Sequence, residues 1–147
     1  MPHRITLRSL RALGACAAGL EAFRAACPRG LTVATTPAGR ARQAARLAAT
    51  LGDRADWYAY HTDARTADWS AYDAAIADAR AARNAADADA WATYREASAA
   101  AWAAPTDAYD AAIAAAGAAY DAAIVSAWGT YRAASLRALL DTLAGPG

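Results

Sequence analysis

The second half of the chain repeats one aromatic spacing in a background of alanine, and this pattern restricts the fold more than any other feature. Residues 71–144 contain 33 alanines, and alanine is the strongest helix former. Tyr109, Tyr120 and Tyr131 are 11 residues apart, as are Trp91 and Trp102. Because 11 residues advance a helix by three turns and about 20°, each set lies along one helix face. The spacing predicts long helices, straight or with a slight right-handed supercoil, that carry an aromatic stripe.

Pro105 interrupts this pattern. Proline lacks a backbone donor and clashes with the preceding helical turn. The tyrosine spacing also changes here, because Tyr94 and Tyr109 are 15 residues apart. We therefore expect two helices, at about 68–103 and 106–143, folded as an antiparallel hairpin. A single kinked helical rod is the alternative.

Short helices with clear ends are expected in the first third of the chain. Thr6 is a capping residue for a helix from Leu7 to Leu13, and Gly14 is a typical stop. Two further helices are predicted at residues 16–26 and 37–51, the second capped by Thr35 or Thr36. Residues 31–33 are expected to form a short extended link between them, with a brief β-bridge as the alternative. The expected fold is all-α and without a sheet. It comprises a small basic helical unit at residues 1–67 and an alanine-rich hairpin with an 11-residue aromatic repeat at residues 68–147.

Charge is divided unevenly between these two parts. Residues 1–67 hold ten Arg against four Asp or Glu, a net charge of +6, whereas residues 68–147 hold five Arg against ten, a net charge of −5. The two parts can attract each other, or a basic end can meet an acidic partner. Several arginines recur at helical spacing and are candidate nucleic-acid contacts: Arg4, Arg8, Arg11, Arg42 and Arg46. The simpler interpretation is a solvated basic face.

The two cysteines predict free thiols. Cys16 and Cys27 would be roughly 16 Å apart on one helix, too far for a disulfide, so we expect a reducing cytoplasm. The segment Leu13-Gly14-Ala15-Cys16 matches a bacterial lipoprotein cleavage box, but Arg8 and Arg11 interrupt the apolar stretch that export requires. No strongly apolar segment of 18 residues is expected to span a membrane.

Catalytic and metal sites are not expected. A thiol nucleophile would need Cys16 or Cys27 beside His61 as its base. Metal ligation would have to use His61 with Asp63, or Asp87 with Asp89, and neither pair has the ligand number of a known site. We predict a non-enzymatic protein with no catalytic residue, cofactor or metal.

Bulky side chains for a core are scarce, and five Trp and seven Tyr supply most of the area. The simplest role for the aromatic stripe is the seam between two helices. These side chains overflow one seam, so part of the stripe is predicted to be exposed and to form a homo-oligomer or a protein interface. The predicted interface residues are Trp102, Tyr109, Tyr120, Trp128 and Tyr131.

One resemblance covers nearly the whole chain. Residues 7–23 contain Leu-Gly-Ala-Cys and Leu-Glu-Ala-Phe, followed by Asp56-Trp57 and by repeats of Ala-Tyr-Asp-Ala-Ala. In these motifs the chain resembles small alanine-rich proteins encoded by phages and prophages of GC-rich bacteria. The resemblance implies a phage setting, but no settled activity and no catalytic residues.

These observations lead to one predicted function and one alternative. The prediction is a phage-type interaction protein in the cytoplasm of a bacterial host. It would act by self-assembly or by binding a host protein, in one version as an inhibitor of a bacterial defence system. The alternative is a small nucleic-acid-binding protein that uses the arginine-bearing helices.

Overall fold

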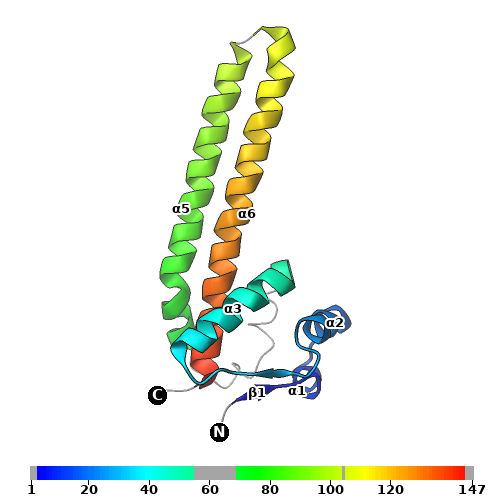
Figure 1. Cartoon of the computed structure of the whole chain (residues 1–147). Coiled ribbons are helices and arrows are strands. Elements are labelled where there is room, and N and C mark those ends of the chain that lie inside the picture. The colour runs from blue at the N-terminus through cyan, green and yellow to red at the C-terminus, as the bar shows by residue number, and fades with distance from the viewer. Residues whose placement is uncertain (1–2, 55–68, 104, 145–147) are drawn as a thin grey trace. The chain divides into compact units, whose positions relative to one another are not determined.

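The computed structural model describes residues 3–54, 69–103 and 105–144, and it is predominantly helical (Figure 1). The all-α expectation is confirmed at this level. In chain order the elements are β1 (Arg4–Ile5), α1 (Leu7–Ala12), α2 (Ala17–Ala26), β2 (Leu31–Thr32), α3 (Pro37–Leu51), the 3-10 turn η1 (Gly52–Arg54), α5 (Trp69–Trp102) and α6 (Thr106–Ala144). The expected break at Pro105 is confirmed by the end of α5 and the start of α6.

The chain divides into two compact units. The first unit comprises residues 1–78 and 131–147, and the second unit comprises residues 79–130. Helices α5 and α6 therefore contribute residues to both units. The boundary expected between residues 67 and 68 lies outside the described part of the chain.

The short helices begin and end where the capping residues predicted. The Thr6 hydroxyl accepts a hydrogen bond of 3.1 Å from the Ser9 amide, and the Ser9 hydroxyl accepts one of 2.9 Å from the Thr6 amide. This reciprocal arrangement satisfies two backbone donors that the helix leaves unpaired. Thr36 caps α3 by accepting a hydrogen bond of 3.1 Å from the Gly39 amide.

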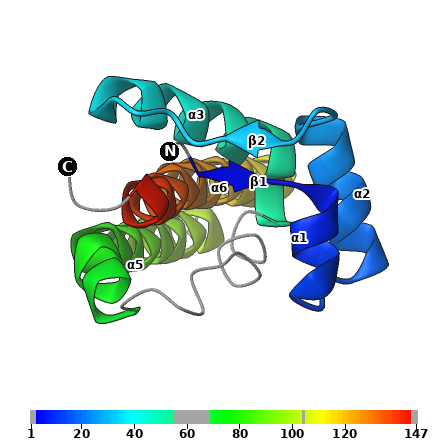
Figure 2. The same cartoon turned by 90° about the horizontal axis from the view of Figure 1, so that it is seen from below.

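A two-stranded sheet pairs the residues before α1 with the residues after α2. The expectation of no sheet is therefore wrong. β1 and β2 pair antiparallel, with Arg4 opposite Thr32 and Ile5 opposite Leu31 (Figure 2). Ile5 and Leu31 are buried, and pairing satisfies backbone groups that would otherwise be buried alone. Gly30 precedes β2 with a φ of 81°, and a Cβ there would lie 2.8 Å from the Ile5 carbonyl oxygen. This close approach requires glycine.

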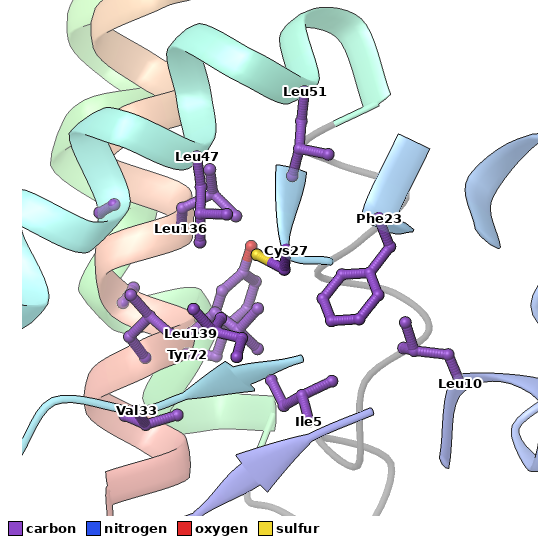
Figure 3. Close-up of a cluster of buried hydrophobic side chains, with 14 of the residues drawn as sticks. Ile5, Leu10, Phe23, Cys27, Val33, Leu47, Leu51, Tyr72, Leu136 and Leu139 are labelled. Carbon is purple, nitrogen blue, oxygen red and sulfur yellow. The ribbon is translucent and has the colours of Figure 1, made fainter. Parts of the chain in front are cut away.

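The core of the first unit draws on segments far apart in the sequence. Leu47 of α3 lies beside Leu136 of α6, with Leu139 of α6 next to Tyr72 of α5, and Leu51 of α3 points into the same cluster (Figure 3). Phe23 of α2 fills another part of the cluster and is fully buried. The scarce large apolar residues of the chain are therefore concentrated in this unit, where they replace the alanine that dominates elsewhere.

Two polar contacts tie the end of α6 into the same unit. The hydroxyls of Tyr72 and Ser135 are hydrogen bonded at 2.6 Å. The carboxylate of Asp141 accepts hydrogen bonds from Arg40 of α3 and, at 2.7 Å, from Arg137 one helical turn earlier. The Arg40–Asp141 ion pair joins the basic and acidic parts of the sequence, which is one of the two contacts that their opposite charges allow.

In the second unit, aromatic side chains connect α5 with α6. The ring centroids of Trp91 and Tyr120 are 6.0 Å apart, and those of Trp102 and Tyr109 are 5.2 Å apart. Arg83 lies over the ring of Trp128, 4.5 Å from its centroid. As residue numbers rise along α5, those of the α6 partners fall.

Candidate interaction surface

An aromatic cluster lies in the middle of the second unit. The rings of Trp91 and Tyr94 stack, with centroids 5.5 Å apart and planes inclined by 21°. Tyr120 of α6 meets both rings, with an edge-on contact to Trp91 and a centroid distance of 5.9 Å to Tyr94. Offset-stacked and edge-on geometries are the arrangements that aromatic rings prefer. The cluster therefore holds Trp91 by two tyrosines, one on its own helix and one on α6.

Trp102 forms a second aromatic pair with Tyr109, close to the helix break at Pro105. Its side chain is 76% exposed although it touches Tyr109, and that of Trp91 is 49% exposed. The two tryptophans are 11 residues apart on one helix, so they face the same direction within about 20°. We call Trp91 and Trp102, with Tyr94, Tyr109 and Tyr120 beside them, the aromatic face.

Two polar atoms of α5 lie one turn before these tryptophans. Asp87 is four residues before Trp91, and Ser98 is four residues before Trp102. Asp87 Oδ1 and Ser98 Oγ are both buried, and neither has a hydrogen-bond partner among the described residues. A long side chain on a helix leans toward the turn before its own Cα, and each of these atoms belongs to the turn before a tryptophan.

The predicted interface residues differ in how far their side chains are exposed. Trp102 is exposed, and Tyr109 and Tyr120 are half-buried beside the two tryptophans. Trp128 is half-buried under the guanidinium of Arg83. The prediction of an interface role is wrong for Tyr131. Its side chain is buried in the first unit, so it belongs to the core and not to a surface.

Sequence reasoning omitted Trp91 from the predicted interface. Its 11-residue relation to Trp102 was the signal, but the number of aromatic residues alone does not tell which ones the opposite helix covers. Tyr72 also belonged to the predicted stripe, and it is buried in the first unit. Part of the excess aromatic area is therefore covered by the N-terminal elements.

The five arginines singled out as nucleic-acid contacts are all exposed: Arg4, Arg8, Arg11, Arg42 and Arg46. Arg4 donates a hydrogen bond of 3.1 Å to the carbonyl of Arg29. For the other four, no guanidinium hydrogen bond or ion pair is found within the described part of the chain. Arg40 was not singled out, yet it forms an ion pair with Asp141.

The cysteines are free, and their surroundings differ. Cys16 is exposed, whereas Cys27 is buried. Burial raises the pKa of the Cys27 thiol, and the charge of Arg46 acts against this by lowering it. A thiol that burial holds in its neutral form is a poor nucleophile.

The other chemical sites considered from sequence find no support in the described residues. His61, the base considered for a thiol, and Asp63, the metal ligand considered with it, lie outside the part of the chain that the structure describes. Among residues 3–54, 69–103 and 105–144, no group of three or more His, Cys, Asp or Glu could hold a metal ion.

Helix α6 is apolar enough by composition to cross a membrane. The segment Ala108–Ala144 reaches a mean hydropathy of 1.4 over 18 residues. The expectation that no segment spans a membrane stays a prediction. Alanine is the commonest residue in this segment, and a single such helix is weak evidence for a membrane span.

Comparison with known proteins identifies no relative. No protein-family model, curated protein sequence or solved structure matches this chain.

Proposed function

We propose that the protein is a non-enzymatic interaction protein that binds another protein through the aromatic face of its second unit. The observation that carries this proposal is the exposure of two large rings, Trp91 at 49% and Trp102 at 76%, on one side of α5. Tryptophan is enriched among the residues that dominate binding energy at protein interfaces. Both rings are held by tyrosines, so little side-chain freedom is lost when a partner covers them.

We further propose that α5 and α6 form an antiparallel hairpin with an 11-residue aromatic repeat that serves as a scaffold for this face. The three cross-helix contacts, Arg83 with Trp128, Trp91 with Tyr120 and Trp102 with Tyr109, support this arrangement. In such a hairpin the tyrosines of α6 occupy the seam. The tryptophans of α5 lie at its flank, where a partner can reach them.

The setting that we propose is a bacterial host cytoplasm in which a phage-type protein binds a host protein or assembles with itself. It rests on the resemblance of residues 7–23 and of the Ala-Tyr-Asp-Ala-Ala repeats to small phage proteins. Inhibition of a bacterial defence system is one version of this role.

The test is a pull-down from bacterial lysate with three proteins: the wild type, the double variant Trp91→Ala with Trp102→Ala, and Val125→Ala. Val125 is 70% exposed on α6 and lies outside the aromatic face. Val125→Ala therefore serves as a control that removes exposed apolar area elsewhere on the second unit. We expect proteins captured by the wild type and by Val125→Ala to be lost with the double variant, and nuclease treatment to have no effect. Circular dichroism checks that all three remain helical. Equal capture by the folded double variant would refute the proposal.

Nucleic-acid binding by the first unit is the second candidate, and the exposed arginines of α1 and α3 favour it. Binding to phosphates releases counterions, so its affinity falls steeply as the salt concentration rises. An aromatic interface responds little to salt. Capture that disappears with nuclease, and that Arg8→Gln with Arg11→Gln abolishes, would support this candidate over the aromatic face.

A further inference from the structure

The aromatic face contains an unmatched carboxylate oxygen beside an exposed ring. Asp87 Oδ1 is buried without a hydrogen-bond partner among the described residues, one helical turn before Trp91. Buried acceptors are nearly always paired in native structures, so such an atom calls for an explanation. A cationic partner group that covers the exposed indole of Trp91 would also lie close to this carboxylate and compensate its charge.

Arginine is the side chain that meets both conditions. Its planar guanidinium stacks on aromatic rings and donates hydrogen bonds to carboxylates at the same time. The second unit already contains one such contact, because the guanidinium of Arg83 lies 4.5 Å from the centroid of the Trp128 ring. Trp91 and Trp102 offer the same kind of ring at 49% and 76% exposure.

The net charges of the two units indicate which part of the chain could supply such arginines. The second unit holds three Arg against six Asp or Glu, a net charge of −3, and the first unit holds twelve Arg against eight, a net charge of +4. Several exposed arginines of the first unit make no guanidinium hydrogen bond or ion pair within the described residues, among them Arg8 and Arg11 of α1, and Arg42 and Arg46 of α3.

We propose that the aromatic face of one molecule binds the arginines of α1 and α3 on a second copy of the chain. This inference rests on the proposed function and names the partner of the same face. Two aromatic faces meeting each other would bring together two units that each carry a net charge of −3, which repel. The contact therefore joins two different surfaces, and each molecule keeps one free surface of each kind, so that copies add head to tail.

The test uses two variants that each remove one surface. The aromatic variant carries Trp91→Ala and Trp102→Ala. The basic variant carries glutamine at positions 8, 11, 42 and 46 in place of arginine. At low salt and high micromolar concentration, light scattering after size exclusion should show wild-type assemblies well above the 15.1 kDa of one chain. Each variant alone should be a monomer, and an equimolar mixture should form a dimer of about twice that mass.

Rescue by mixing distinguishes this contact from a symmetric one. If like surfaces met, the variant that keeps that surface would self-associate on its own, and mixing the two variants would restore nothing further. Raising the salt should dissociate the assemblies because screening weakens the attraction between the two units. Circular dichroism confirms that both variants are folded before they are mixed.

A single substitution tests the role of the carboxylate. Asp87→Asn removes the charge beside Trp91, and Glu96→Gln removes the same charge from an exposed position of α5 that faces away from Trp91 by about 140°. We expect Asp87→Asn to reduce self-association several-fold and Glu96→Gln to change it little. Equal effects would contradict the pairing of arginine with Asp87.

Three results would overturn the inference: a wild-type monomer at low salt, a mixture that stays monomeric, or equal effects of the two acidic substitutions. The proposed function would still stand if the aromatic variant lost its lysate partners while the wild type remained monomeric. If self-association followed these expectations but lysate capture did not depend on the tryptophans, a host-protein role would fail while self-assembly remained.

Discussion

Tyr72 of α5 and Ser135 of α6 share a hydrogen bond of 2.6 Å between their hydroxyl oxygens, and both side chains are buried in the core of the first unit. A buried hydroxyl that loses its partner keeps the desolvation penalty without the bond. The pair therefore fixes which faces of the two helices meet at this point, among apolar side chains that would tolerate other registers.

We expect Tyr72→Phe and Ser135→Ala each to lower the free energy of unfolding by about 1–3 kcal/mol. Each substitution removes one of the two buried hydroxyls that share the hydrogen bond. The double variant should lose less than the sum of the two, since both substitutions break the same hydrogen bond. Urea denaturation of all four proteins gives this coupling. Strict additivity would show that the two hydroxyls do not act as a pair.

Alanine substitutions along α6 should lower the free energy of unfolding at buried positions and change it little at exposed ones. Leu139 is fully buried in the first unit, and Val125 is 70% exposed. Leu139→Ala is expected to lower the free energy of unfolding by about 2–5 kcal/mol, and Val125→Ala by less than about 0.5 kcal/mol. Thermal denaturation followed by circular dichroism measures both. Similar effects at the two positions would mean that the end of α6 does not belong to the core.

The ion pair between Arg40 and Asp141 should contribute modestly to stability. The side chain of Arg40 is 13% exposed and that of Asp141 is 39% exposed, so solvent screens the contact in part. We expect Asp141→Asn to lower the free energy of unfolding by about 1 kcal/mol. Asp121→Asn, an exposed acid on the same helix, is the control and should have little effect. High salt should reduce the difference between the two variants.

The two thiols should differ in reactivity and in their effect on stability. In the native protein a thiol reagent should modify Cys16 quickly and Cys27 only slowly, since Cys27 is buried and its pKa is raised from 9.0 by that burial. The neutral thiol is favoured in the folded state. The contribution of Cys27 to stability is therefore fully present below pH 9.0, its ordinary value, and is lost as pH rises through its raised folded pKa.

Cys27→Ala should remove this alkaline decrease, and Cys16→Ala should not. Peptide mapping after brief labelling, together with urea denaturation at pH 7 and above pH 9.0, checks both expectations. Rapid native labelling of Cys27 would contradict its burial.

Local chemistry explains why the helix ends were predictable. Thr6, Gly14, Thr36 and Pro105 act through their own backbone or through the next turn, so their effects can be inferred without knowing the fold. The pairing of β1 with β2 could not be inferred in this way. Two strands of two residues carry almost no periodic signal, and their pairing depends on Gly30 and on a core that the rest of the chain supplies.

The candidate interaction surface was predictable in kind but not in its members. The 11-residue spacing indicates which aromatic residues share a face, and Trp102 was identified from it. Which rings are covered depends on long-range packing: Tyr131 is buried in the first unit, whereas Trp91 remains half-exposed. Opposite charge predicted attraction between the two parts of the sequence, but not that Arg40 and Asp141 would be the residues that meet.

The core of the first unit also has a consequence for biosynthesis. Arg40 and Asp141 are 101 positions apart, and Leu136, Leu139 and Leu140 fill the same cluster as Leu47 and Leu51. During translation, residues up to 54 therefore emerge from the ribosome long before the leucines that complete their core. This unit can reach its final packing only after residue 140 has left the exit tunnel, and until then Phe23, Leu47 and Leu51 are available to chaperones.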